Sequence, residues 1–559
     1  MAGLLAIRRA ANRSKLRRTR EIARVLGGHG LETLAEALGL RRFLPRFGAT
    51  PNGKPLTQAQ RLRLALGELG VTFIKLGQML STRADLFPPD VIAELSKLQD
   101  QAPPVPFPVI RQILREELPG SKLDSIAWIE GAPLASASVG QVHEALLRDG
   151  TAVVIKVRRP GVVEQVEQDL AILRGLIDWV QVHTPIGRDY ELRPLMAEFA
   201  YTLRDELDYV REGQNATRLR LAFEKDPAVW IPRVYDELTT TRVLTMERVG
   251  GVKFAEVERL ERLRTQKRKI AENAVRLFLR QVFEIGFFHA DPHPGNFFVQ
   301  PDGSLAVVDF GMVGRLTEGT QRHLMAALLA GTREDAEGLA EELYALGVAG
   351  HRADRAAFER DLAHLLARYG QSSIKDLSAA TVTDELFSMA FRHKLQLPSE
   401  LAQLLRVINM AEGLGLTLDP EFRYLEFATP IIKKLGKHRF SPVAMARRAG
   451  QAALEAAELG ADFPRRAARL LGRLERGEMT IKVDHRGLDE TTREFQRMTN
   501  RLVLAMILAA SIIALGLAAG IRMVPSLEPV VGWLFRIALL FSLAFGLSVM
   551  WEMWRSGRR

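Results

Sequence analysis

Three polar residues in the middle of the chain could bind a magnesium-bound phosphate. Asp291 and Asn296 lie five positions apart in a Pro-rich loop, and Asp309 follows thirteen positions later in the sequence Asp-Phe-Gly. Carboxylate and amide oxygens are ligands that Mg²⁺ prefers. Phosphoryl transfer also needs a group that positions the attacking oxygen. We therefore assign Asn296 and Asp309 as magnesium ligands and Asp291 as the base or orienting group.

The spacing of these residues matches the catalytic loop of kinases. His289, Asp291 and Asn296 fit the pattern H-x-D-x-x-x-x-N, and an apolar segment precedes Asp309. A lone Asp-Phe-Gly is common by chance, but the two motifs together, with a hairpin expected between them, are specific. His289 and His293 could instead suggest a zinc pair. Their loop is Pro-rich rather than helical, so we interpret His289 as a brace for the loop.

Two upstream segments could contact the rest of a nucleotide. Lys156 ends the apolar run Val-Val-Ile-Lys, after a turn expected at residues 148–150. In kinases such a strand lysine contacts the α- and β-phosphates, whereas a lysine on an edge strand is otherwise simply solvated. The segment 246–249 follows a second apolar run, where a kinase presents backbone groups to adenine. We assign Glu247 and Val249 to this hinge.

The segment expected to cover the phosphates is poor in glycine. Kinases have G-x-G-x-x-G there, but residues 135–143 read Ala-Ser-Ala-Ser-Val-Gly-Gln-Val-His. Alanine permits close approach of the backbone but restricts its conformation more than glycine does. Serine hydroxyls and backbone N–H groups could still hold a phosphate. The residues assigned to nucleotide contact here are Ala135, Ser136, Ala137, Ser138, Val139 and Gly140.

Four motifs, in order, give the chain a specific resemblance. Lys75-Leu-Gly-Gln78, the alanine-containing loop 135–143, Glu206-Leu-Asp208 and the catalytic-loop pair at 289–311 resemble the UbiB family. This family consists of atypical kinase-like proteins linked to ubiquinone biosynthesis. The resemblance covers roughly residues 20–480. Leu134 stands just before the loop where the family often has more alanine, a small departure.

The resemblance implies roles for residues that spacing alone leaves open. It implies that Lys156 pairs with Glu212, and that Lys75 meets Glu206 of the E-x-D motif. The helix carrying Lys75 and Gln78 would then cover the active site. Such a helix would block a protein substrate, so the family resemblance favours an ATPase over a protein kinase that acts on other chains. Lys75, Gln78, Glu206 and Asp208 are therefore assigned a regulatory role.

Strand-forming segments cluster early in the chain, and helical patterns dominate later. We therefore expect an α+β, two-lobed protein-kinase-like fold with added helical segments. The expected domains are a helical extension at 1–120, an N-lobe at 121–250, a helical C-lobe at 251–430, a helical linker at 431–500 and a two-helix transmembrane hairpin at 501–559.

The transmembrane expectation depends on two apolar runs near the C-terminus. Residues 502–521 carry no charge, and residues 530–551 are interrupted only by Arg536. A helix of about twenty apolar residues spans a bilayer core, although a buried helical pair in a soluble domain is the alternative. Arginines flank both outer ends of the hairpin, while the connection has only Arg522. The positive-inside rule then places the large N-terminal part in the cytosol.

Composition restricts the remaining possibilities. The chain has no cysteine, which excludes thiolate catalysis, disulfides and cysteine-bound zinc, and its formal net charge is +11. A basic excess suits nucleic acid or an anionic membrane equally well. The apolar runs favour the membrane, and we expect no nucleic-acid partner. The basic first twenty residues could be a transit peptide or a solvated helix, but we favour a basic helix near an anionic leaflet.

The sequence thus predicts a protein of the bacterial inner (cytoplasmic) membrane that binds and hydrolyses ATP with Mg²⁺ to support ubiquinone biosynthesis. Expected partners are membrane lipids, isoprenoid quinone intermediates and quinone-biosynthesis enzymes, and a homodimer is a further expectation. Two alternatives stay open. One is a true kinase that phosphorylates a lipid or small-molecule hydroxyl. The other is a non-enzymatic scaffold gated by nucleotide.

Overall fold

The computed structural model describes residues 2–43, 56–98, 102–184, 187, 190–254, 256, 267–348, 354–370 and 378–439, with single positions at 506, 509, 513, 533 and 540. Chain contacts separate two units, Met1–Ala446 and Arg447–Arg559. The architecture below is that of the first unit.

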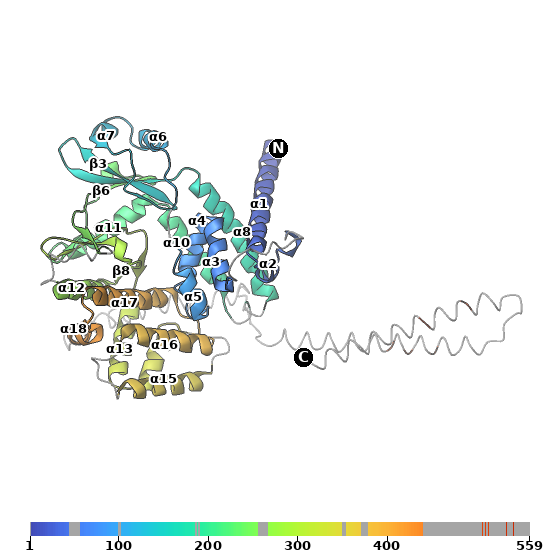
Figure 1. Cartoon of the computed structure of the whole chain (residues 1–559). Helices are drawn as coiled ribbons and strands as arrows, with labels where there is room; N and C mark the ends of the chain where they lie inside the picture. Colours follow the sequence, from blue (N-terminus) through green and yellow to red (C-terminus); the bar gives the residue numbers. More distant parts are fainter. Residues whose placement is uncertain are drawn as a thin grey trace, which may run out of the picture. The chain divides into compact units, whose positions relative to one another are not determined.

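Helices precede, connect and follow the strands of this unit (Figure 1). The helices before the first strand are α1 (Ala2–Gly28), α2 (Glu32–Ala37), η1 (Arg41–Phe43), α3 (Gln58–Leu69), α4 (Val71–Leu80), α5 (Pro89–Leu95), α6 (Phe107–Glu117) and α7 (Ser121–Asp124). Those among the strands are α8 (Val162–His183), α10 (Leu192–Glu206), α11 (Tyr209–Phe223), η2 (Asp236–Leu238), α12 (Lys267–Arg280), η4 (Gln281–Ile285) and η5 (Pro294–Asn296). Those after the last strand are α13 (Glu318–Thr332), α14 (Ala336–Ala345), α15 (Arg355–Gly370), α16 (Ala379–Arg392), α17 (Ser399–Leu418) and α18 (Tyr424–Arg439).

A five-stranded antiparallel sheet forms the small lobe. Its strands are β1 (Ile126–Ile129), β2 (Ala135–Ser136), β3 (Gly140–Leu147), β4 (Ala152–Arg158) and β6 (Val243–Glu247). They are ordered β1-β3-β4-β6, and β2 pairs with β3. The turn expected at 148–150 does join β3 to β4, and Lys156 lies opposite Val142 and Leu244 on the neighbouring strands.

Side chains of β4 alternate between two environments, which fixes the face on which Lys156 lies. Val153, Ile155 and Val157 are fully buried and belong to a separate small core with Ile110 and Leu114 of α6. Figure 1 shows α6 lying over this side of the sheet. Because successive strand residues point to opposite faces, Lys156 lies on the other face.

Two smaller sheets hold the catalytic-loop region. One is ordered β5-β10-β9-β7 and the other pairs β11 with β8. Their strands are β5 (Val229–Trp230), β7 (Val252–Lys253), β8 (Phe287–His289), β9 (Phe297–Val299), β10 (Leu305–Val307) and β11 (Val313–Arg315). The hairpin expected across residues 301–303 is confirmed as β9 and β10. Strands β5, β7, β8 and β11 have only two or three residues, too few to show a period of two.

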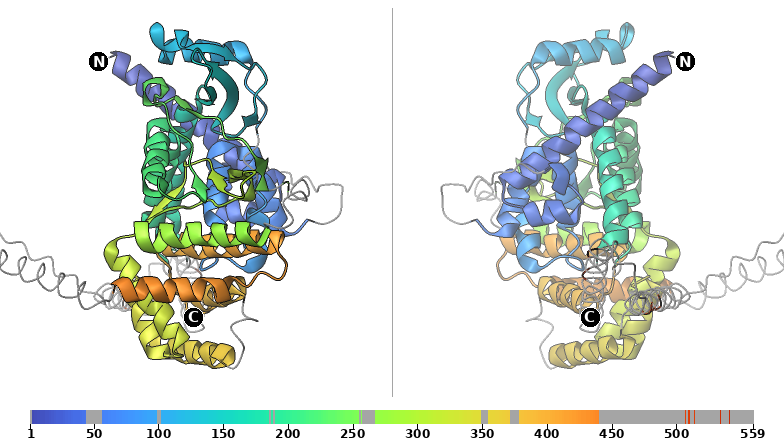
Figure 2. Two further views of the ribbon diagram at one scale, coloured as in Figure 1. Left: turned by 90° about the vertical axis from the view of Figure 1, so that its left-hand side faces the viewer. Right: turned by 90° about the vertical axis from the view of Figure 1, so that its right-hand side faces the viewer.

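The basic N-terminal segment is helical, but it is not wholly a surface feature. Ile22, Ala23 and Leu26 of α1 are buried in the main core. The Arg18 Nε donates to Asp169 of α8 at 2.8 Å, and the Thr72 hydroxyl donates to the same carboxylate at 2.9 Å. Figure 2 shows α1 running obliquely past α8. Arg18 is therefore used to hold α1 in the fold, which corrects its assignment to a membrane-facing set.

The segments expected to cross a membrane fall outside the described residues except at isolated positions. Met506, Ile513, Trp533 and Leu540 are each helical and more than half exposed. Across the described residues, no helix combines the length and apolarity needed to span a bilayer.

Candidate active site

Lys156 is the centre of a cluster that gathers charges from three elements. Its Nζ lies 2.8 and 2.9 Å from the two carboxylate oxygens of Glu212 in α11. It also lies 3.8 Å from Oδ1 of Asp309. Glu212 is 2% exposed and Lys156 17%, whereas the Asp309 side chain is 52% exposed. Lys156 therefore lies between the buried carboxylate of Glu212 and the exposed carboxylate of Asp309, which a ligand from solvent can reach.

Burial and charge act in opposite directions within this cluster. Burial tends to lower the pKa of Lys156, but Asp309 and Glu212 outweigh it and hold that pKa well above its usual value. Burial raises the pKa of Glu212 despite its ion pair with Lys156. The lysine lowers the pKa of Asp309 below its usual value. An ionised carboxylate, favoured further by this shift, is the form that binds a metal.

The backbone at Asp309 is held in an unfavourable conformation. Its φ is +64°, in the left-handed region that non-glycine residues rarely adopt. The neighbouring Phe310 is buried, and its carbonyl accepts a hydrogen bond from Asn215 of α11 at 3.1 Å. Such strain persists only where the surroundings enforce it, and it is typical of functional sites. Asn215 has no sequence motif that would have identified it.

The catalytic loop is fixed by His289, as expected from the sequence. His289 is fully buried, and its Nδ1 accepts from the N–H of Asp291 at 3.2 Å. Its other ring nitrogen lies 3.3 Å from the carbonyl of Val308, and the Gln281 side chain accepts from its backbone N–H. The histidine thus ties the loop to the segment that leads into Asp309, and its interpretation as a brace is confirmed.

Asn296 and Asp291 are held together within the loop. The Asn296 amide nitrogen donates to the backbone carbonyl of Asp291 at 3.1 Å. With the nitrogen used in this way, the amide oxygen is the atom left for a metal. In the part of the chain that the structure describes, no group of three or more His, Asp or Glu residues could hold a metal alone. Mg²⁺ is commonly held by one or two carboxylates together with substrate phosphates and water. Asn296 and the exposed carboxylate of Asp309 fit such a shared site.

One arginine near the loop was missed from the sequence. Arg406 of α17 approaches the Asp291 carboxylate, with 4.0 Å between Nη2 and Oδ1. Both side chains are partly exposed, at 27% and 38%. A cation beside the expected base can orient its carboxylate. Nothing in the sequence around Arg406 distinguishes it from other helix-surface arginines, so only the fold could identify it.

The alanine-containing loop is a tight turn between β2 and β3. The Ala137 N–H donates to the Gly140 carbonyl at 2.8 Å. Arg159 stabilises the turn with two hydrogen bonds. It donates to the Ala137 carbonyl at 2.7 Å and to the Ser136 hydroxyl at 2.8 Å. Ala135 is exposed and Ser136 and Ala137 are half-buried, whereas Ser138, Val139 and Gly140 are buried. The side chain of Val139 packs in the main core. Val139 could therefore contact a phosphate through its backbone but not through its side chain.

Gly140 is required by a close approach beneath the loop. A Cβ at this position would lie 2.1 Å from the Tyr209 hydroxyl oxygen and 2.7 Å from the Val157 carbonyl. Tyr209 is fully buried, and within the described residues its hydroxyl makes no hydrogen bond. The Lys156 Nζ lies 5.2 Å from its ring centroid. Burial raises the pKa of Tyr209 above its usual value, so the phenol is neutral.

We expect Gly140→Ala to destabilise the protein by about 1–3 kcal/mol, the usual cost of overpacking a core. Tyr209→Phe in the same chain should recover part of this loss, because it removes the nearest clashing atom. Thermal unfolding would measure both effects. Gly131→Ala is the matched control, since its new Cβ would meet only Phe107 at an ordinary 3.7 Å. Equal unfolding temperatures for Gly140→Ala and Gly131→Ala would contradict the close packing.

The assigned hinge lies at the end of β6. The backbone N–H of Glu247 donates to the Arg233 carbonyl at 2.8 Å, and its carboxylate accepts from the Arg233 N–H at 3.2 Å. Val249 follows the strand and is half-buried. Their contact with adenine stays a prediction.

The K-x-G-Q helix meets the E-x-D motif as the family resemblance implied. The Lys75 ammonium of α4 pairs with the Glu206 carboxylate at the end of α10. Both side chains are largely buried, at 11% and 15% exposed. Asp208 caps the N-terminus of α11, accepting from Val210 N–H at 3.1 Å. Gln78 turns away from this pair and donates to the Leu98 carbonyl at 3.2 Å.

These contacts bring together Lys156, Glu212 and Asp309, and Lys75 with Glu206. A Cβ added at Gly311, two residues after Asp309, would lie 3.7 Å from Cγ of Glu206, so the Lys75–Glu206 pair lies close to the segment that carries Asp309. Gln78 contacts none of these residues in the hydrogen bonds described. Asp208 acts through the start of α11, four residues before Glu212. The arrangement can bind a polyanion through Lys156 and a divalent cation through Asp309.

Comparisons with known proteins show which family the chain resembles. Residues 97–343 match an ABC1 atypical kinase-like domain, residues 362–423 a UbiB helical domain, and residues 486–555 an ABC1/UbiB kinase-like C-terminal domain. An uncharacterized protein of Synechocystis is 34% identical over 484 residues, covering 84% of this chain and 83% of that protein. "Probable protein kinase UbiB" of Cellvibrio japonicus is 36% identical, covering 76% and 78%. The protein of the same name from Marinobacter nauticus is 36% identical, covering 69% and 72%.

Proposed function

Because this chain belongs to the UbiB family of atypical kinase-like proteins, we propose that it binds Mg-ATP and hydrolyses it at the cluster around Lys156. The observation that carries the proposal is the meeting of Lys156, Glu212 and Asp309, drawn from β4, α11 and the segment after β10. A cation fixed by a buried carboxylate, next to an accessible carboxylate, is an arrangement suited to a metal-bound triphosphate.

Each protein group has a distinct task in this proposal. Lys156 binds the α- and β-phosphates, and Glu212 holds its ammonium in place. Asp309 and Asn296 supply oxygens to Mg²⁺, which when bound neutralises phosphate charge. Asp291 orients the attacking oxygen and accepts its proton. Positioning and electrostatic stabilisation supply most of the catalysis in phosphoryl transfer, so fixed geometry matters more than a strong nucleophile.

We propose water, rather than a protein hydroxyl, as the acceptor. The ion pair between Lys75 and Glu206 fastens α4 beside the charge cluster. A helix held there leaves little room for an extended peptide. The name "Probable protein kinase UbiB" borne by several relatives supports the rival, in which the γ-phosphate goes to another hydroxyl. Within that rival we propose a small molecule or a lipid as the acceptor, because α4 leaves little room for a protein.

We further propose that hydrolysis supports ubiquinone biosynthesis at the inner membrane, with the nucleotide site on the cytosolic side. Support comes from the family and from the apolar runs at 502–521 and 530–551. The proposed ligands are isoprenoid quinone intermediates and membrane lipids, and the proposed partners are enzymes of the same biosynthesis.

The fate of the γ-phosphate tests the proposed reaction. We expect the purified full chain, given γ-labelled ATP and Mg²⁺, to release labelled phosphate in amounts equal to the ATP consumed. Asp291→Asn should lower the rate at least about a hundredfold, within the range for loss of a general base. Transfer of label to an added lipid or metabolite would instead establish the kinase.

A measurement of ubiquinone in cells distinguishes the proposed enzyme from a non-enzymatic scaffold. A strain lacking the chain should regain its ubiquinone with the wild type but not with Asp291→Asn. Full recovery with Asp291→Asn, and none with variants that fail to bind nucleotide, would favour a scaffold gated by nucleotide.

A further inference from the structure

A cavity lies between α12 and α18, and it shares no residue with the charge cluster. Its volume is about 820 Å³, within the range of about 300–1,000 Å³ typical of small-molecule sites. Charged residues of α12 and Glu284 of η4 line it together with residues of the segment 421–434, which includes part of α18. Its lining residues include Phe427, Pro430 and Ile431 of α18, which give it an apolar part.

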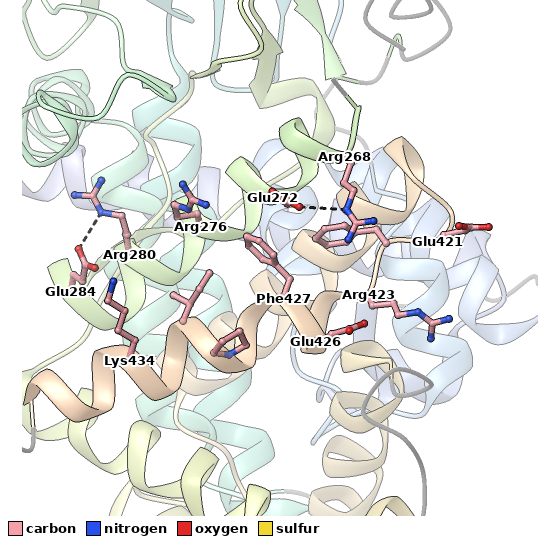
Figure 3. Close-up of a pocket in the computed structure, with 13 residues that line it drawn as sticks. Arg268, Glu272, Arg276, Arg280, Glu284, Glu421, Arg423, Glu426, Phe427 and Lys434 are labelled. Atoms are coloured by element: carbon pink, nitrogen blue, oxygen red, sulfur yellow. Dashed lines mark hydrogen bonds and ion pairs between the residues drawn. The ribbon is translucent and has the colours of Figure 1, made fainter. Parts of the chain in front are cut away.

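The charges lining this cavity are separated along the helices (Figure 3). At one end lie Arg276, Arg280, Glu284 and Lys434, and at the other lie Arg268, Glu272, Glu421, Arg423 and Glu426. The first end carries an excess of positive charge, and the second a slight excess of negative charge. Phe427 lies between the two ends, so a molecule that reached both would pass over its ring.

Two cations at the first end are available to a ligand. Arg280 is already used, because it pairs with Asp226 and with Glu284 at 3.1 Å. Within the described part of the chain, neither Arg276 nor Lys434 forms an ion pair, and both side chains are exposed. Two cations that line the same end of one cavity and form no ion pair among the described residues are suited to bind a phosphate or carboxylate.

The middle of the cavity offers apolar contact. Phe427 and Ile431 are partly buried and pack against the main core, which makes them a firm surface. Pro430 lies inside α18.

We propose that the cavity between α12 and α18 binds an amphipathic anion. Its phosphate or carboxylate contacts Arg276 and Lys434, and its aromatic or alkyl body lies on Phe427 and Ile431. This site is separate from the proposed nucleotide site, and the proposal does not depend on ATP hydrolysis.

Binding of 1-naphthyl phosphate to the full chain, followed by its fluorescence anisotropy, tests the proposal. We expect the variant Arg276→Gln/Lys434→Gln to bind this probe at least about tenfold more weakly, the usual consequence of losing charged hydrogen bonds. Arg268→Gln, a matched change at the opposite end, should alter affinity less than about twofold if the charge separation governs binding. Neutral 1-naphthol and inorganic phosphate should each bind more weakly than the joined molecule.

Competition with Mg-ATP tests whether this site is distinct from the proposed nucleotide site. Saturating Mg-ATP should leave binding of 1-naphthyl phosphate unchanged, whereas displacement by Mg-ATP would contradict a separate site. Equal binding by wild type and the double variant would overturn the proposal, because both changes are at exposed positions and should leave the fold intact.

Two competitors identify the source of the natural ligand. Displacement of 1-naphthyl phosphate by hexyl phosphate alone would indicate a free amphiphile. Displacement by dihexanoyl phosphatidic acid would indicate a lipid headgroup with part of its chains. Failure of both competitors would contradict the apolar part of the site.

Discussion

Lys156→Met should lower kcat/KM for ATP hydrolysis by at least about a hundredfold, since loss of one preorganised charge contact commonly costs 10²–10³. The substitution keeps an unbranched side chain, one heavy atom shorter, and removes its charge. Glu212, 2.8 Å away and 2% exposed, would lose its partner, and Asp309 would lose its nearest cation. Lys97→Met is the matched control, because Lys97 is 59% exposed and pairs only with Glu94 among the ion pairs described. Similar kcat/KM values for the two variants would contradict a role for Lys156.

The same variant should acquire a pH-dependent stability. Burial already raises the pKa of Glu212, and loss of Lys156 would raise it further. A carboxyl whose pKa is raised on folding takes up a proton more readily when folded, so it stabilises at low pH and this stability is lost as pH rises through the folded pKa. Lys156→Met should therefore unfold at a higher temperature near pH 5 than near pH 8, relative to wild type. Adding Glu212→Gln should remove the difference.

Asp85→Ala should destabilise the fold by about 3–5 kcal/mol, the cost of leaving a buried charge unpaired. Arg83 donates to the Asp85 carboxylate at 2.8 and 2.6 Å, and the two side chains are 2% and 0% exposed. The backbone N–H of Leu397 also donates to Asp85 at 3.0 Å. This carboxylate therefore joins the segment after the K-x-G-Q helix to the segment before α17.

Two further variants separate the charge effect from a packing effect. Arg83→Met/Asp85→Leu removes both charges while keeping much of the volume, and should cost far less than Asp85→Ala. Asp178→Ala breaks an ion pair whose side chains are 58% and 60% exposed, and should change stability little. Chemical denaturation would rank the three. If Asp85→Ala lowered the free energy of unfolding no more than Asp178→Ala does, the proposed role of the buried Arg83–Asp85 ion pair would be contradicted.

The parts of the site that depend on local sequence could be predicted. His289, Asp291 and Asn296 lie within one loop, and Asp309 follows the adjoining hairpin, so spacing alone brings them together. The apolar run that ends at Lys156 and the turn before it likewise placed this lysine on a strand. The contact between Lys75 and Glu206 spans 131 residues, and only the family resemblance could suggest it.

Contacts between distant helices could not be predicted from the sequence. The hydrogen bond from Leu397 to Asp85 spans 312 residues, and no periodic pattern encodes such a pairing. Arg406 belongs to a helix with no motif, yet it approaches the expected base. Arg18 lies in a basic run typical of a surface helix, but Asp169 across the core binds it. Each depends on tertiary packing, which overrides what charge and composition suggest locally.

Calorimetric titration of Mg-ATP into the full chain tests the central claim most directly. The account predicts that wild type binds ATP more tightly with Mg²⁺ than without it, and that Asp309→Asn loses this dependence on the metal. Asp302→Asn, a change in the turn between β9 and β10, should behave as wild type. Mg²⁺-dependent binding by Asp309→Asn equal to that of wild type would contradict a magnesium-triphosphate site at Lys156 and Asp309.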